Sequence, residues 1–166
     1  MKSSVSTNIK KRIIPNDVFI TPLPLAKTAI DLIEWTPEDI WLDPFKNDGS
    51  YYNQYPEICN KKWCEILDNV DFFDFDEPVD IICSNPPYSC LDKVIEKSIN
   101  LNPRVINYLI GINNLTARRL EMFEKANYGL TKLHMCKVFK WYGMSIIVQF
   151  EKNKKSIISY DRIVWK

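Results

Sequence analysis

The segment PVDIICSNPPYSCLDKVIEKSINL, residues 78–101, predicts a strand, a rigid turn and a helix in direct succession. Its first residues form a short apolar run, which is typical of a parallel strand that is covered on both faces. After the prolines, apolar residues recur at the spacing of one helical face, at Leu91, Val94, Ile95 and Ile99. A strand that leads directly into a helix is the repeating unit of α/β sheets.

The same alternation extends over most of the chain. A helix of about three turns is predicted after the prolines of TPLP, over residues 23–35. Further elements are predicted as strands at 39–43, 60–66 and 104–112, a weaker strand at 70–75, a helix at 114–127, and a hairpin of 131–140 with 144–152. Residues 156–166 are expected to add another strand or to pack as a tail. Strands alternating with helices predict an α/β fold, a doubly wound, mostly parallel, Rossmann-like sheet with a C-terminal antiparallel hairpin.

Length and composition favour a single domain. The 166 residues are 46% hydrophobic, which is enough for one core. Residues 1–16 are polar and basic and are expected to form a flexible arm, so that residues 17–166 make up the domain. No apolar run is long enough to span a bilayer, and the N-terminus lacks a signal-peptide pattern. We therefore expect a soluble, intracellular protein with no membrane partner.

The cysteines and the histidine exclude several kinds of site. The 5 cysteines are odd in number and never stand at CxxC spacing, so neither a disulfide framework nor a structural zinc site is expected. His134 is the only histidine of the chain, which excludes mechanisms that need two imidazole groups. No metal site is predicted.

The overall charge makes no case for a nucleic-acid ligand. With 22 basic and 21 acidic side chains, the formal net charge is +1. Any such case depends on local basic patches, at residues 10–12, at Arg118–Arg119 and at residues 152–155. Solvated faces and tails carry similar runs, so no single patch is decisive.

The turn NPPY, residues 85–88, combines hydrogen-bond acceptors with a flat ring. Pro86 and Pro87 stiffen the backbone and remove its N–H groups. The side-chain carbonyl of Asn85 and the backbone carbonyl of Pro86 are available acceptors, and Tyr88 offers an aromatic face. This combination suits an exocyclic amino group on a planar ring. The alternative is a proline-stiffened connection without a ligand.

Loops at 43–50, 65–74 and 84–89 all follow predicted strands. In a doubly wound sheet, ligands bind beyond the carboxyl ends of the strands. We therefore expect these loops to meet at one edge of the sheet and to share one site.

Five segments in this order resemble the motifs of amino-group DNA methyltransferases, which transfer a methyl group from S-adenosylmethionine (SAM) to adenine N6. They are VFITPLPLAKTAI (18–30), WLDPFKNDGS (41–50), WCEI (63–66), VDFFDF (70–75) and SNPPYS (84–89). The resemblance runs from about residue 18 to residue 100, and NPPY is its most specific part. It implies SAM as the cofactor and accounts for the C-terminal hairpin, which ends the sheet in that superfamily.

The resemblance also implies roles for individual residues in cofactor binding. It assigns the methionine end of the cofactor to Thr21 and Pro22, and the loop around it to Asp43, Phe45 and Gly49. It assigns the ribose hydroxyls to Glu65, and the adenine to Asp71 and Phe72. Ordinary structural roles remain the alternatives: a surface charge for Glu65, a turn for Asp71, the core for Phe72 and a helix cap for Thr21.

The cofactor loop departs from the family pattern at one position. Asn47 stands where the family normally has a glycine, and it is flanked by the charged residues Lys46 and Asp48. Asparagine enters the left-handed backbone region more readily than other non-glycine residues, so the turn can be kept.

For the acceptor, the resemblance implies that the catalytic turn is Asn85, Pro86, Pro87 and Tyr88. Asn85 and the Pro86 carbonyl would accept hydrogen bonds from the target amino group, and Tyr88 would stack on the base. Further substrate contacts are assigned to Trp141, Tyr142, Arg118 and Arg119.

The expected function is methyl transfer to adenine N6 of DNA. RNA adenine N6, cytosine N4 and the side-chain amide of glutamine in proteins remain alternatives, because each presents a planar conjugated amino group. An inactive partner subunit with the same fold is a further alternative. The chain has no evident target-recognition domain, so specificity would come from a second subunit, a homodimer or the basic patches.

Overall fold

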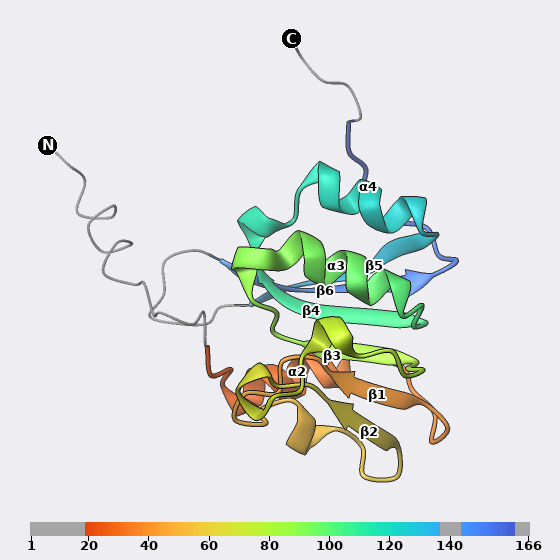
Figure 1. The fold of residues 1–166 in the computed structure, drawn as a ribbon. Helices are drawn as coiled ribbons and strands as arrows, with labels where there is room; N and C mark the ends of the chain where they lie inside the picture. Colours follow the sequence, from red (N-terminus) through yellow and green to blue (C-terminus); the bar gives the residue numbers. More distant parts are fainter. Residues whose placement is uncertain (1–18, 137–143, 162–166) are drawn as a thin grey trace, which may run out of the picture.

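The computed structural model describes residues 19–136 and 144–161, which form an α/β structure around one six-stranded sheet. The strands lie in the order β2-β1-β3-β4-β6-β5. Their bounds are Ile40–Asp43 (β1), Asn60–Trp63 (β2), Ile81–Ser84 (β3), Val105–Gly111 (β4), Tyr128–Cys136 (β5) and Ser145–Lys152 (β6). The pairs β1–β2, β1–β3 and β3–β4 are parallel, whereas β6 is antiparallel to β4 and to β5. The predicted mostly parallel sheet with a C-terminal antiparallel hairpin is confirmed (Figure 1).

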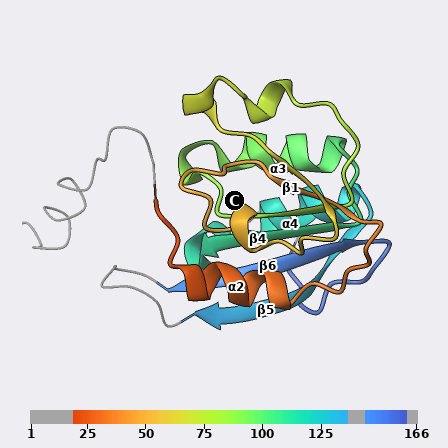
Figure 2. The same cartoon turned by 90° about the horizontal axis from the view of Figure 1, so that it is seen from below.

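Three helices cover the two faces of this sheet. Helix α2 (Leu23–Asp31) packs on one face, while α3 (Leu91–Asn100) and α4 (Ala117–Lys125) pack on the other (Figure 2). Short 3₁₀ turns occupy Tyr52–Gln54, Ile66–Asp68, Phe72–Asp74, Tyr88–Cys90 and Ile112–Asn114.

Strand β4 shows why the central strands are mostly apolar. Ile106 and Tyr108 belong to the core under α3 and α4, whereas Val105 and Leu109 belong to the core under α2. Successive side chains of a strand point to opposite faces, so a strand covered on both faces is apolar on both, and the buried Asn107 is accommodated because its Nδ2 donates to Ala29 O and to Gln149 Oε1. The layered arrangement therefore follows directly from the sequence pattern.

Several predicted elements are shorter than expected, and one is wrong. The helix predicted at 23–35 ends at Asp31, and the strand predicted at 60–66 ends at Trp63. Residues 70–75 do not form a strand. The Asp71 carboxylate accepts a hydrogen bond from Phe73 N at 2.9 Å and caps a 3₁₀ turn. Such a local bond between an aspartate and the backbone two residues on competes with strand pairing.

The described part of the C-terminal segment, residues 156–161, packs as a tail. Ile157 N donates to Leu130 O at 2.8 Å, but no strand forms there. The predicted arm at 1–16 lies outside the described residues, as do Trp141 and Tyr142. Within the described ranges, no helix has both the length and the apolar character needed to cross a membrane.

Candidate functional site

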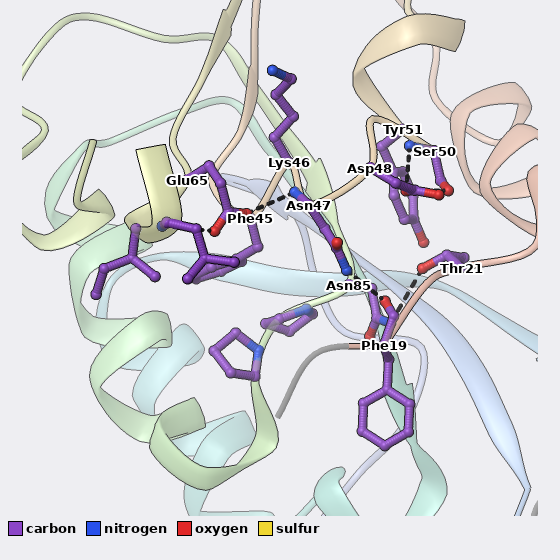
Figure 3. Close-up of a pocket in the computed structure, with 14 residues that line it drawn as sticks. Phe19, Thr21, Phe45, Lys46, Asn47, Asp48, Ser50, Tyr51, Glu65 and Asn85 are labelled. Carbon is purple, nitrogen blue, oxygen red and sulfur yellow. Dashed lines mark hydrogen bonds between the residues drawn. The ribbon is translucent and has the colours of Figure 1, made fainter. Parts of the chain in front are cut away.

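A cavity of about 400 Å³ lies at the carboxyl ends of the parallel strands (Figure 3). Four segments form its wall: Phe19 and Thr21 before α2, residues 45–48 with Ser50 and Tyr51 after β1, residues 65–67 after β2, and residues 85–87 after β3. The three loops that were expected to share a site do converge on this cavity. The segment before α2 completes it.

The cavity wall contains only some of the residues assigned from the sequence. Those in the wall are Thr21, Phe45, Glu65, Asn85, Pro86 and Pro87. Those not in it are Pro22, Asp43, Gly49, Asp71, Phe72 and Tyr88. The wall also includes residues to which no ligand contact was assigned, namely Phe19, Lys46, Asn47, Asp48, Ser50, Tyr51, Ile66 and Leu67. Each of these lies within two positions of an assigned residue, so the motif positions were the signal that could have found them.

The amide of Asn85 is held by Thr21. Asn85 Nδ2 donates a hydrogen bond to Thr21 Oγ1 at 3.2 Å, and Thr21 is buried. Because the NH₂ side of the amide is engaged in this way, its carbonyl oxygen is left as the acceptor for a ligand. Pro86 and Pro87 follow directly in the wall, so the acceptors of the turn stand on a stiff backbone.

The loop after β1 is folded by residues in the left-handed backbone region. Asn47 has φ 48° and Gly49 has φ 89°, which confirms the expectation that asparagine can keep this turn. A Cβ on Gly49 would lie 2.5 Å from Asn53 Nδ2, the end of an exposed side chain that can move aside, so it is the φ of 89° that requires glycine there. Asn47 also donates from Nδ2 to Phe19 O at 3.3 Å, which links the loop to the segment before α2.

Glu65 connects this loop to the next one. Its Oε2 accepts a hydrogen bond from Asn47 N at 2.7 Å, and its Oε1 accepts one from Leu67 N at 3.1 Å. A carboxylate has about four acceptor positions, so both oxygens keep capacity for the hydroxyl groups of a ligand. Ile66 and Leu67 stand beside it in the wall and are 69% and 67% exposed, so they offer an apolar surface next to the carboxylate.

Asp43 lies behind the cavity rather than in its wall. Its side chain is fully buried and accepts hydrogen bonds from Ser84 Oγ at 2.6 Å, Phe45 N at 3.2 Å and Tyr52 N at 3.2 Å. Burial raises the pKa of Asp43 to about 7, against the opposing effect of these hydrogen bonds. Asp43 thus joins the end of β1 to the end of β3 and positions the loops that follow them.

Asp71 and Phe72 support the cavity from outside. The ring of Phe72 is buried and meets Phe45 edge-on, with centroids 5.3 Å apart. The Asp71 carboxylate is used to cap its own turn. Phe45 is therefore the member of this group that faces the cavity.

The basic patches differ in what they can contact. Arg119 holds α4 to α3, since its Nε donates to Asp92 Oδ1 at 2.7 Å and its Nη1 donates to Asn114 O at 2.8 Å. Arg118 forms an ion pair with Asp92 at 3.3 Å, but its side chain is 76% exposed and so remains accessible to a ligand. The hydrogen bond and the charge of Arg119 lower the pKa of Asp92. Residues 152–155 begin where β6 ends, beside Val105 at the start of β4. They therefore lie at the amino ends of the parallel strands, whereas the cavity lies at the carboxyl ends.

Comparison with family models and with curated proteins finds no match. Similar solved structures include a candidate RNA methyltransferase from Pyrococcus horikoshii, with 15% identity and a TM-score of 0.64 over 81% of this chain and 87% of that one. They also include magnesium protoporphyrin IX methyltransferase from Synechocystis with bound SAM, with 9% identity and a TM-score of 0.61 over 90% of this chain and 92% of that one. The Mtq2–Trm112 complex from E. cuniculi, which methylates the termination factor eRF1, matches with 15% identity and a TM-score of 0.59 over 82% of this chain and 99% of that one.

These matches establish the fold. The chain has the Rossmann-like fold of these methyltransferases, with the same kind of sheet over most of its length. Their acceptors are an RNA, a porphyrin and a protein, so the fold by itself does not select an acceptor.

Proposed function

We propose that this protein is a SAM-dependent methyltransferase that methylates an exocyclic amino group of nucleic acid, adenine N6 of DNA in particular. The observation that carries the proposal is the shared cavity of about 400 Å³, which brings Glu65 and the loop of Gly49 together with the Asn85–Pro86 turn. A methyl donor and its acceptor must meet in one such space, because the transfer needs both held in line.

The residues in the wall fit the ribose, the adenine and the methionine part of the cofactor. Glu65 has carboxylate lone pairs for the ribose hydroxyls, and the apolar side chains of Ile66, Leu67 and Phe45 suit the faces of an adenine ring. The left-handed residues Asn47 and Gly49 let the backbone turn tightly beside the space for the methionine part of the cofactor. When bound, SAM supplies an electrophilic methyl group on a sulfonium.

The turn after β3 would hold the acceptor. The carbonyl oxygen of Asn85 and the backbone carbonyl of Pro86 accept hydrogen bonds from the target amino group, which turns the nitrogen lone pair toward the methyl group. Both acceptors also stabilise the positive charge that develops on that nitrogen. Thr21 keeps the Asn85 amide in the required orientation through its 3.2 Å hydrogen bond. Tyr88 follows in the chain and would stack on a base that has left its duplex.

The choice of DNA rests on the likeness of the NPPY turn to amino-group DNA methyltransferases. Arg118 supports a phosphate-bearing ligand, because its side chain on α4 is 76% exposed. A second subunit or a homodimer would supply the sequence specificity of such an enzyme. Methylation of a protein glutamine is the second candidate, favoured by the match to the Mtq2–Trm112 complex over 99% of that chain.

The test combines cofactor titration with methyl transfer. Calorimetric titration of the wild-type protein with SAM is followed by tritium transfer from labelled SAM to duplex DNA, single-stranded DNA, RNA and a glutamine-containing termination-factor peptide. We expect SAM to bind and adenine in DNA to take up the label.

Label in RNA or in the peptide alone would overturn the choice of acceptor but keep the methyltransferase. Absence of SAM binding would overturn the enzyme proposal itself and favour an inactive partner subunit.

A further inference from the structure

Tyr51 is a buried side chain in the cavity wall whose hydroxyl has no hydrogen-bond partner within the described residues. It is 3% exposed, and only Trp41 Nε1 shares this condition in that part of the chain. Trp41 does not line the cavity, whereas Tyr51 does. A buried polar group without a partner is costly, and native proteins rarely keep one that nothing binds.

The hydroxyl of Tyr51 points toward Thr21 and Asn85 in the close-up (Figure 3). The neighbouring polar groups already have partners: Ser50 Oγ donates to Asp48 Oδ1 at 2.7 Å, and Asn85 Nδ2 donates to Thr21. Burial raises the pKa of Tyr51 well above its usual value, so the hydroxyl keeps its proton and is available as a donor. An acceptor without hydrogens of its own would therefore satisfy it.

The proposed cofactor has such an acceptor. Glu65 lies on one side of the cavity, and Ser50, Tyr51 and Thr21 lie on the other (Figure 3), so a cofactor with its ribose at Glu65 would have its methionine part beside these three residues. We propose that the Tyr51 hydroxyl donates a hydrogen bond to the carboxylate of the methionine part of SAM, and so positions the methyl group against Asn85. This inference rests on the proposed function. It adds a specific residue and a specific ligand atom to it.

The experiment compares Tyr51→Phe with the wild-type protein against two ligands. Calorimetry gives the Kd for SAM and for decarboxylated SAM, which lacks only the carboxylate. We expect the substitution to weaken SAM binding roughly 10- to 100-fold, as for loss of a hydrogen bond to a charged group. The Kd for decarboxylated SAM should stay the same in the two proteins. Without ligand, the urea midpoint of Tyr51→Phe should be equal to or higher than that of the wild type, because an unpaired buried hydroxyl has been removed.

Tyr55→Phe is the matched control. Tyr55 is buried like Tyr51, but its hydroxyl donates to the carbonyl oxygens of Leu42 and Cys83 and does not line the cavity. The control should lower the urea midpoint and leave the affinity of the folded protein for SAM unchanged.

Each other outcome counts against the inference. Equal loss of affinity for both ligands would show that the hydroxyl does not act on the carboxylate, and unchanged SAM affinity would show that it does not act on the cofactor. A Tyr51→Phe protein that is less stable or unfolded would show that the hydroxyl has a protein partner. Failure of the wild-type protein to bind SAM is a separate result, because it removes the proposed function before any variant is compared.

Discussion

The loop after β1 and the turn after β3 face one cavity, but they are kept rigid by different means. The turn is stiff through covalent structure, because Pro86 and Pro87 fix their own backbone angles. The loop is held by left-handed residues and by backbone N–H groups bonded to the carboxylates of Asp43 and Glu65. A loop held by hydrogen bonds depends on many single groups, whereas a proline turn depends on few. The conformation of the cofactor side should therefore depend more on single substitutions and on pH than the conformation of the turn does.

The largest expected effect separates the two sides by function. Asn85→Ala removes a proposed acceptor of the target amino group without touching the loop after β1. We expect the rate of methyl transfer to fall at least about 100-fold while the Kd for SAM is unchanged. Tritium transfer and calorimetry measure the two quantities. Asn100→Ala, at an exposed position on α3, is the control and should change neither. A parallel loss of SAM affinity would show that the two sides are not separate.

The second effect is a pH dependence of the free energy of unfolding, which comes from Asp43 behind the loop after β1. Burial raises its pKa from the ordinary 3.8 to about 7, so between these pH values the folded chain holds a proton that the unfolded chain releases. The wild-type free energy of unfolding should therefore decrease as the pH rises through this window, by about 1.4 kcal/mol per pH unit relative to Asp43→Asn. Urea unfolding of both proteins across the window gives the difference. A difference that does not change with pH would mean that Asp43 is ionised throughout.

Gly49→Ala tests the left-handed backbone of the loop. A φ of 89° is strained for any residue with a Cβ, so we expect a loss of about 1–2 kcal/mol in stability together with weaker SAM binding. Gly111→Ala receives the same substitution at φ −70°, with the nearest atom at 3.4 Å, and should change both quantities little. Similar losses in the two variants would show that the backbone of the loop can adjust.

The smallest effect concerns Asn47, which stands where the amino-group DNA methyltransferases that the sequence resembles have a glycine. Asn47→Gly loses the 3.3 Å hydrogen bond to Phe19 O but keeps the left-handed backbone, so stability should change by less than about 1 kcal/mol. Asn47→Ala loses the same bond and also pays the cost of the left-handed region, which is about 1–2 kcal/mol. The difference between the two free energies of unfolding isolates the backbone cost. If the variants are equally stable, the side-chain bond and not the backbone holds this position.

The sequence predicted the fold well where one physical requirement dominates. Strands β3 and β4 are covered on both faces, which leaves mostly apolar runs that are easy to identify. The prediction failed at residues 70–75, because aspartates alternating with phenylalanines resemble a half-buried strand while Asp71 in fact bonds to its own turn. Periodicity does not reveal such a local bond.

For the candidate site, the sequence predicted which loops meet at the cavity but not the contacts between them. The bond between Thr21 and Asn85 joins residues 64 positions apart, and no local pattern encodes it. The partnerless hydroxyl of Tyr51 is equally invisible in the sequence, since it depends on what surrounds the side chain in three dimensions. The expectation that Asn47 keeps the turn was confirmed, because the ability to adopt the left-handed backbone conformation is a property of asparagine itself.

The segment before α2 has a practical consequence for anyone who handles this protein. Phe19 and Thr21 belong to the cavity wall, so a dye or tag attached at Ile20, which lies between them and is 66% exposed, would stand beside the cavity. Fluorescent reporters for ligand titration gain signal from that location, whereas tags used for kinetic work are better attached at the other end of the chain or removed.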